Sequence, residues 1–274
     1  MRIIANSLPK AGTHLLVRFL QLAGYEYVRK GLTGALIRST QRNPIKRYLT
    51  SRKRCTSNDS GCYQIDLDNL GNRIKKKYLD SFINSIPENS FIPAHLPYSE
   101  ELDCYLSAQR LKVIYIIRDP RDVLLSYYNH QHRDPRYPFH DVFRTLPFEQ
   151  CYQYILRGMK KGNITLASIK SRVENSIGWF TSDNVIGIRF EDLVGEKGGG
   201  TRANQINAIQ KILSYLEIGS TNSGVERIAD HLFYSKARTF FKGRISRWKN
   251  EYSQCIAADV NREMYSTIRQ LGYE

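Results

Sequence analysis

A stretch near the start of the chain, Ser7 to Leu16, combines a lysine, a glycine and a histidine in a pattern that suits anion binding. Gly12 permits a tight turn, so the backbone amides from Ala11 to His14 can converge at the start of a helix, where partial positive charge attracts anions. A Walker A loop instead places its lysine directly after the last glycine and adds Ser or Thr for a metal ion. Because Lys10 precedes Gly12, the pattern points away from a nucleoside triphosphate with magnesium.

A strand and a helix must hold this turn in place. The apolar run from Arg2 to Ala5 predicts the strand. After the turn, apolar residues recur at helical spacing and predict a helix that ends at Gly24, namely Leu15, Leu16, Phe19, Leu20 and Ala23. An ordinary surface turn has the same pattern, so the functional interpretation depends on agreement with the rest of the chain.

A second predicted strand, Lys112 to Ile117, leads into another helix start with charged residues. Asp119 is a suitable N-cap, Pro120 suits the first helical position, and Asp122 complements the helix dipole. Arg118 directly follows the strand. This second strand is therefore followed by a turn with charged residues, as the strand from Arg2 to Ala5 is.

Arg118 and Ser126, eight positions apart, can both face the carboxyl edge of a parallel sheet. With these residues, the chain resembles the PAPS-dependent sulfotransferases of the cytosolic, P-loop-like type. The resemblance makes Pro9 to Thr13 the 5′-phosphosulfate loop and Arg118 to Tyr128 the 3′-phosphate segment. The nucleotide-binding residues that it implies in this part of the chain are Lys10, Ala11, Gly12, Thr13, His14, Leu15, Arg118 and Ser126.

A C-terminal segment resembles the same family. Thr239 to Gly243, followed by Trp248 to Asn250, is similar to a nucleotide-binding segment that normally contains Arg-Lys-Gly. Phe241 stands where the family has the arginine. The resemblance implies nucleotide contacts from Phe240, Phe241, Lys242 and Gly243, and the candidates to replace the missing guanidinium are Arg238, Arg244 and Arg247.

Ala94 to Pro97 is similar to the family's Thr-His-Leu-Pro, whose histidine is the catalytic base. The resemblance therefore implies that His95 takes the acceptor proton while Lys10 stabilises the leaving phosphate oxygen. His14 is a rival base, because the family normally has Thr at that position. The expected reaction is in-line, metal-independent transfer of a sulfuryl group from PAPS to a hydroxyl or amine of a small-molecule acceptor, leaving PAP.

The residue types suit this chemistry. A sulfuryl group carries less charge than a phosphoryl group, so positioned Lys, Arg and amide donors can stabilise its transfer without a metal ion. Two alternatives remain open. A nucleotide kinase of similar fold should carry the Walker lysine and a metal-binding Ser or Thr, and a nucleic-acid-binding protein should carry basic residues interleaved with aromatic residues on one surface.

The length of 274 residues and the hydrophobic content of 41% favour a single α/β domain over residues 1–274. We expect a central parallel sheet of about four or five strands with helices on both faces, of the P-loop NTPase-like sulfotransferase fold. Val185 to Phe190 predicts another of its strands, and the resemblance places Phe190 beside the nucleotide base. The formal net charge of +15 indicates an anionic partner without identifying it.

Five cysteines, odd in number and without a Cys-x-x-Cys pair, indicate reduced packing residues rather than a disulfide framework or a zinc site. No apolar run approaches the roughly 20 residues of a membrane span, and no signal peptide is evident. We therefore expect a cytoplasmic protein with no membrane or nucleic-acid partner.

Segments outside the motifs have weaker patterns. Residues 30–72 are interpreted as a mobile segment with a short helix over 45–49; the resemblance implies that it covers the acceptor pocket, and a solvated basic loop is the alternative. Residues 129–147 are interpreted as a binding loop. The resemblance implies that the glycines of 195–201 are a flexible insertion. A short strand and turn is expected over 91–97, and helices over 73–86, 100–109, 148–159, 164–177, 204–216 and 259–271.

Overall fold

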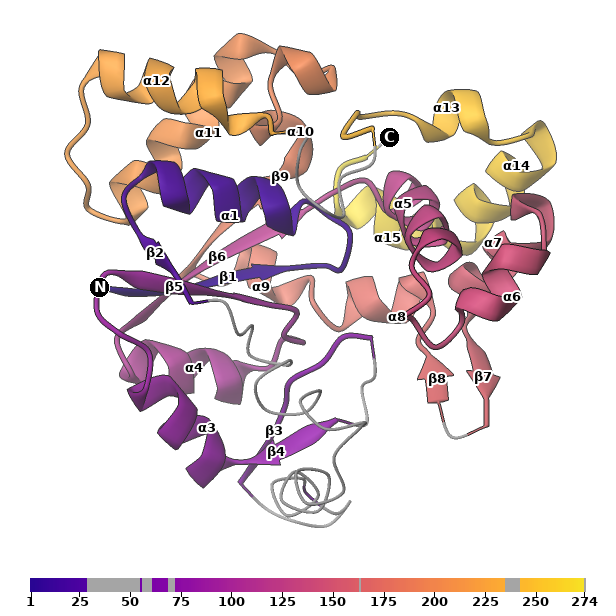
Figure 1. Ribbon diagram of the computed structural model, residues 1–274, viewed down its shortest axis with the longest axis horizontal. Coiled ribbons are helices and arrows are strands. Elements are labelled where there is room, and N and C mark those ends of the chain that lie inside the picture. Colours follow the sequence, from indigo (N-terminus) through magenta and orange to yellow (C-terminus); the bar gives the residue numbers. More distant parts are fainter. Residues whose placement is uncertain (29–54, 56–60, 69–71, 163, 235–241, 274) are drawn as a thin grey trace.

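Five parallel strands form the central sheet in the computed structural model, which describes residues 1–28, 55, 61–68, 72–162, 164–234 and 242–273 (Figure 1). In spatial order they are β2 (Glu26–Tyr27), β5 (Ser90–Ala94), β1 (Arg2–Ser7), β6 (Leu111–Ile117) and β9 (Val185–Arg189). At the centre, Ile4 of β1 lies opposite Ile92 of β5 and Val113 of β6. The predicted α/β class and parallel sheet are confirmed.

Each face of the sheet carries its own hydrophobic core, because successive side chains of a strand point to opposite faces. On one face, Ile3 and Ala5 pack with α1 (Thr13–Leu22), α11 (Arg202–Tyr215) and α12 (Asn222–Leu232). On the other face Ile4 belongs to a core with residues of α3 (Lys76–Asn84), α4 (Glu100–Ala108), α5 (Pro120–Arg133), α7 (Phe148–Arg157) and α8 (Ile169–Glu174). Figure 1 shows α1, α11 and α12 together on one side of the sheet, opposite α3 and α4.

Two short hairpins and several short helices complete the described elements. In the hairpins, β3 (Cys62–Gln64) pairs with β4 (Arg73–Lys75), and β7 (Met159–Lys161) pairs with β8 (Ile164–Leu166). The remaining helices are α6 (His140–Thr145), α9 (Gly178–Thr181), α10 (Phe190–Leu193), the 3₁₀ turn η2 (Glu196–Gly198), α13 (Trp248–Glu251), α14 (Gln254–Glu263) and α15 (Tyr265–Gln270).

Several predicted elements differ from the structure. The helices expected over 73–86 and 164–177 begin as strands β4 and β8, because a hairpin partner holds each segment extended. Residues 129–147 are a loop only in part, since α5 continues to Arg133 and α6 covers His140–Thr145, with a turn over 134–139 between them. The helix expected over 259–271 is divided between α14 and α15, and α12 was not predicted. The helix expected over 45–49, with most of 30–72, lies outside the described residues.

The expectation that all cysteines are reduced is wrong, because Cys55 and Cys62 form a disulfide bond. Their separation of seven residues does not reveal that both lie against the same strand. Cys55 N–H donates to the Arg73 carbonyl at 3.2 Å, and Cys62 pairs with Lys75 of β4. The other cysteines, Cys104, Cys151 and Cys255, are free thiols.

None of the helices in the described part of the chain combines the length and apolar character needed to cross a bilayer. The single domain expected over residues 1–274 and the cytoplasmic location stay predictions.

Candidate active site

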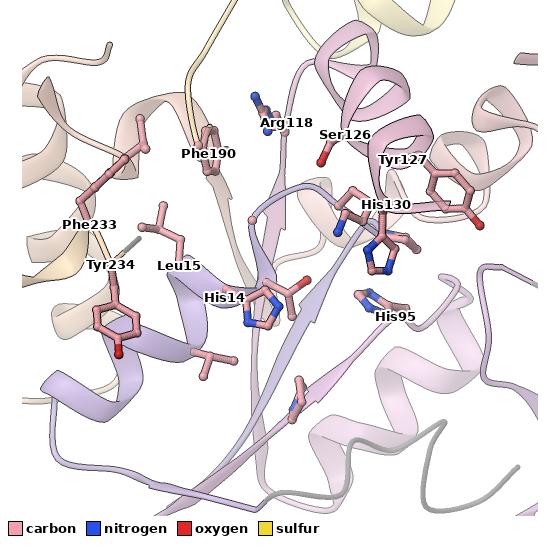
Figure 2. A pocket seen from close by; sticks show the side chains of 18 of the residues that line it. His14, Leu15, His95, Arg118, Ser126, Tyr127, His130, Phe190, Phe233 and Tyr234 are labelled. Carbon is pink, nitrogen blue, oxygen red and sulfur yellow. The ribbon is translucent and has the colours of Figure 1, made fainter. Parts of the chain in front are cut away.

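Four residues predicted from the motifs follow the ends of four neighbouring parallel strands. Lys10 comes just after β1, His95 after β5, Arg118 after β6 and Phe190 after β9. Parallel strands end at one edge of their sheet, which is where ligands bind in α/β folds. All four residues line one cavity of about 320 Å³ at this edge (Figure 2).

The cavity brings together most of the predicted site. Its lining includes the predicted residues Lys10, Gly12, Thr13, His14, Leu15, His95, Arg118, Ser126, Phe190 and Gly243. Ala11 is placed differently: its side chain is fully buried in the core, and its N–H donates to the Leu8 carbonyl at 3.0 Å rather than toward an anion. Lys242 is not part of the lining, and its ammonium donates to Glu251 at 2.9 Å. Phe240 and Phe241 lie outside the described residues.

Gly12 is required at the turn for two physical reasons. Its φ of +119° is in the region that L-residues avoid. A Cβ atom at this position would also lie 2.6 Å from the Phe190 ring and 3.2 Å from Ile116. The bare backbone therefore lets the turn after β1 pack directly on the aromatic ring that follows β9.

We expect Gly12→Ala to lower the melting temperature more than Gly24→Ala does. Gly24 has a similar φ of +93° but nothing within 4 Å of its Cβ position, so its substitution reports backbone strain alone. Overpacking against Phe190 should add about 2 kcal/mol to that strain, or about 4 to 8 °C in melting temperature by thermal denaturation. Equal losses in the two variants would show that Phe190 does not constrain the turn.

Lys10 is held in an uncommon backbone conformation, with φ of +71°, and its side chain lines the cavity. Burial lowers the pKa of this ammonium from 10.5 to about 8, against an opposing effect of the nearby Asp68 carboxylate. Arg118 lowers the pKa further. A partly desolvated cation of this kind interacts strongly with an incoming anion.

The His95 imidazole has a fixed orientation. Its Nδ1 lies 2.9 Å from the Ser7 carbonyl oxygen and 3.1 Å from the Ser7 hydroxyl. Because a carbonyl oxygen only accepts, Nδ1 is the protonated nitrogen of the neutral ring, and Nε2 carries the lone pair. This geometry suits a general base.

Two other histidines also line the cavity. His14 comes from the start of α1, and partial burial lowers the pKa of its imidazole, with Lys10 and His95 adding to the effect. His130 comes from α5, and burial followed by the Lys10 charge lowers its pKa to about 4. Both imidazoles are therefore neutral near pH 7. Figure 2 shows His130 and His95 directed toward the same part of the cavity, with His14 on another side.

Arg118 is almost fully buried in the cavity wall, with 4% of its surface exposed. Its Nη2 donates to the Asp122 carboxylate at 3.0 Å and also to the Arg244 carbonyl. Its guanidinium lies 4.4 Å from the centre of the Phe190 ring. Its Nε has no hydrogen-bond partner among the residues that the structure describes.

Residues 242–252, here called the C-terminal segment, dock on the helix start after β6. Asp119 caps α5, with Pro120 at the first helical position, as predicted. Trp248 N–H donates to Asp122 at 3.1 Å, and the Trp248 indole donates to Asp119 at 3.2 Å. Arg247 lines the cavity and is held by two hydrogen bonds to Glu251, both of 2.9 Å.

The glycines of 195–201 support the C-terminal segment instead of forming a flexible insertion. Ile245 N–H donates to the Gly198 carbonyl at 2.9 Å. A Cβ atom at Gly198 would lie 2.9 Å from the Gly243 carbonyl oxygen. The absence of side chains therefore allows two distant backbones to approach each other closely.

The sequence motifs did not predict several residues of the cavity wall. The end of α12 contributes Leu232, Phe233 and Tyr234, and the β3–β4 connection contributes Asp68. Tyr137, which follows α5, also lines the cavity. The apolar spacing of α12 after Thr221 was a usable signal for the helix, but nothing in it indicates contact with the site. Within the described residues, no group of three or more His, Cys, Asp or Glu could hold a metal ion.

The sequence profile of the sulfotransferase domain family matches residues 2–267. The chain belongs to this family. Human Sulfotransferase 4A1 is 21% identical over 178 residues, which are 62% of this chain and 56% of the relative. Mouse Sulfotransferase 1A1 is 24% identical over 192 residues, 62% of this chain and 60% of the relative. This sulfotransferase-family chain therefore aligns with less than two thirds of the length of each of these relatives.

Solved structures show the same fold at low sequence identity. Mouse sulfotransferase SULT7A1 complexed with PAP has a TM-score of 0.58 and 18% identity, with 98% of this chain and 84% of that chain covered. Retinol dehydratase in complex with androsterone and PAP has a TM-score of 0.60 and 17% identity, with coverage of 97% and 80%. The predicted sulfotransferase fold is confirmed.

Proposed function

We propose that this chain transfers a sulfuryl group from PAPS to a hydroxyl or amine of a small-molecule acceptor. The observation that carries the proposal is the buried Arg118 guanidinium in the cavity wall, whose Nε lacks a hydrogen-bond partner in the described part of the chain. A buried donor left unpaired is costly, so the site fits an anion that completes its hydrogen bonds. The 3′-phosphate of PAPS is such an anion.

Other residues of the cavity fit the 3′-phosphate and the base of the nucleotide. Ser126 and Gly243 line the same cavity as Arg118 and are available to the 3′-phosphate. Of the arginines considered as replacements at position 241, Arg247 lines the cavity, whereas Arg244 is exposed and Arg238 lies outside the described residues. Phe233 and Tyr234 offer aromatic faces, which stack on nucleotide bases.

Lys10 and His95 have separate roles in the proposed reaction. When bound, PAPS supplies the activated sulfuryl group. Lys10 neutralises charge that develops on the leaving phosphate oxygen, and the backbone amides at the start of α1 hold the phosphate. His95 Nε2 accepts the proton of the attacking hydroxyl, while the Ser7 carbonyl keeps the other ring nitrogen protonated. The transfer is direct and needs no metal ion.

We expect the wild-type protein to bind PAP much more tightly than AMP, which lacks the 3′-phosphate. Arg118→Ala should weaken PAP binding by about tenfold to a hundredfold, because one charge-assisted hydrogen bond contributes about 1.5 to 3 kcal/mol. AMP binding should hardly change. Isothermal titration calorimetry measures both affinities.

The ratio of the PAP and AMP affinities separates recognition from stability. Removing Arg118 leaves Asp122, which is fully buried, without its ion-pair partner, so the variant should also unfold more easily. Arg189→Ala is a matched control, since Arg189 ends the neighbouring strand β9 but lies outside the cavity lining. Equal affinity of the wild type for PAP and AMP, or tighter binding of ATP with magnesium or of an oligonucleotide, would contradict the proposal.

A further inference from the structure

Beside Lys10, one part of the cavity is lined by side chains that carry polar atoms. This part, here called the acceptor limb, consists of Asp68, His95, Tyr127, His130 and Tyr137. These residues come from the β3–β4 connection, the end of β5, α5 and the chain that follows α5. Figure 2 shows His95, Tyr127 and His130 on one side of the cavity, across from Phe233 and Tyr234. The limb is therefore separate from the aromatic end proposed for the nucleotide base.

His130 lies one helical turn beyond Ser126 on α5, and residues four apart share a helix face. The same face of α5 therefore runs from the proposed phosphate site into the acceptor limb. The His130 ring packs edge-on against Tyr137, with ring centres 4.2 Å apart. This contact holds the imidazole in the wall of the limb.

A neutral imidazole offers both a hydrogen-bond donor and an acceptor. Burial and the Lys10 charge lower the His130 pKa to about 4, so the imidazole is neutral near pH 7 and becomes protonated only as the pH falls to about 4. Asp68 and Asp134 oppose this effect, and Arg136 adds to it. His130 thus suits an uncharged polar group such as a hydroxyl.

His95 and His130 present different chemistry to an acceptor. The Ser7 carbonyl fixes the His95 tautomer, so Nε2 is committed to receiving a proton. The wall around the two rings is also tied together, since Leu67 N–H donates to the His95 carbonyl at 3.0 Å and Asp68 pairs with Arg172 at 3.6 Å. An acceptor in the limb can therefore contact the His95 base and also the neutral His130 imidazole.

We propose that His130 hydrogen-bonds a second hydroxyl group of the acceptor. Because the His95 and His130 rings are directed toward the same part of the cavity (Figure 2), the preferred acceptors are compounds with two adjacent hydroxyls, vicinal diols or catechols. This inference rests on the proposed function. One hydroxyl oxygen forms the new S–O bond as the S–O bond to the PAP phosphate breaks, and its proton passes to His95. The second hydroxyl stays unchanged and binds His130. Sites built to hydrogen-bond a hydroxyl reject analogues that lack it, because their polar groups are left unpaired.

The test compares matched acceptors on the protein with PAP bound. Catechol is paired with phenol, and trans-cyclohexane-1,2-diol with cyclohexanol. Calorimetry on the PAP complex measures acceptor affinity, and kcat/KM with PAPS measures transfer. We expect the wild type to favour the diol member of at least one pair by about tenfold, the usual effect of one neutral hydrogen bond.

Substitutions at His130 identify the residue responsible. His130→Phe keeps a ring against Tyr137 and should abolish the preference, whereas His130→Gln retains a hydrogen-bonding group and should preserve part of it. His132→Phe is the control, because His132 is exposed on the same helix and outside the cavity lining. Unchanged PAP affinity in each variant shows that the nucleotide site has survived.

The possible failures are distinguishable. The inference would be overturned if the wild type bound both members of every pair equally, or bound neither measurably. PAP binding and sulfuryl transfer to other acceptors would in that case still support the proposed function. A diol preference that persists in His130→Phe would also overturn it. Failure of the wild type to bind PAP would instead contradict the proposed function, and this inference with it.

Discussion

Replacing Lys10 with Ala should lower turnover by about a hundredfold or more while the protein remains folded. One preorganised donor directed at developing charge typically contributes a few kcal/mol to transition-state stabilisation. The backbone of Lys10 is left-handed, with φ of +71°, and Ala tolerates that conformation about as well as Lys does. Thermal denaturation should therefore differ little between variant and wild type, and steady-state kinetics with PAPS would measure the loss.

The charge of Lys10 also predicts a pH dependence. Burial lowers the Lys10 pKa to about 8, and the proposed role requires the protonated ammonium. As pH rises through about 8, free protein loses this charge, so kcat/KM for PAPS should fall on the alkaline side. The residual activity of Lys10→Ala should lack this decline. Lys197→Ala, at an exposed position, is a matched control; near-normal turnover in folded Lys10→Ala protein would refute the assignment.

Substitution of His95 by Ala should lower turnover by about a hundredfold to ten-thousandfold with a hydroxyl acceptor, the usual contribution of a positioned general base. Activity of the wild type should decline toward acid pH, because a protonated imidazole cannot accept a proton. His95→Ala should abolish that decline. Rates measured across pH at saturating PAPS, with PAP affinity as the check on folding, provide the comparison.

His14→Ala is the decisive comparison for the base. His14 stands at the start of α1 and lines the same cavity, but on another side of it from His95, whose tautomer the Ser7 carbonyl fixes (Figure 2). We expect His14→Ala to retain the acid decline and most of the turnover. If His14→Ala loses both while His95→Ala keeps them, the base is His14.

Residues at the strand ends were predictable because their signals are local. A short apolar run followed by a glycine turn places Lys10, and an apolar run followed by Asp-Pro places Arg118 before a capped helix. His95 and Phe190 also directly follow strands. Once the strands are known to be parallel, these positions must meet at one edge.

Other parts of the site depend on contacts between segments that are far apart in the sequence, and local sequence patterns do not predict such contacts. Asp68 reaches the cavity from the connection between β3 and β4, and the disulfide of Cys55 depends on the β3–β4 hairpin. Tyr234 and Phe233 reach it because α12 packs on α1 and ends there. Residues 129–147 were expected as a loop, because composition alone hid the continuation of α5 that carries His130.

The hydrogen bonds from Arg118 to the Arg244 carbonyl and from Trp248 to Asp122 join residues 126 positions apart. A nascent chain can complete β6 and the start of α5 long before the C-terminal segment, which completes the cavity wall around Arg118, has been synthesised. The proposed ligand therefore has no finished site in a partly folded or truncated molecule. Since a ligand that binds only the native state raises the free energy of unfolding by mass action, cellular nucleotide would protect completed molecules from proteolysis and leave unfinished ones exposed to it.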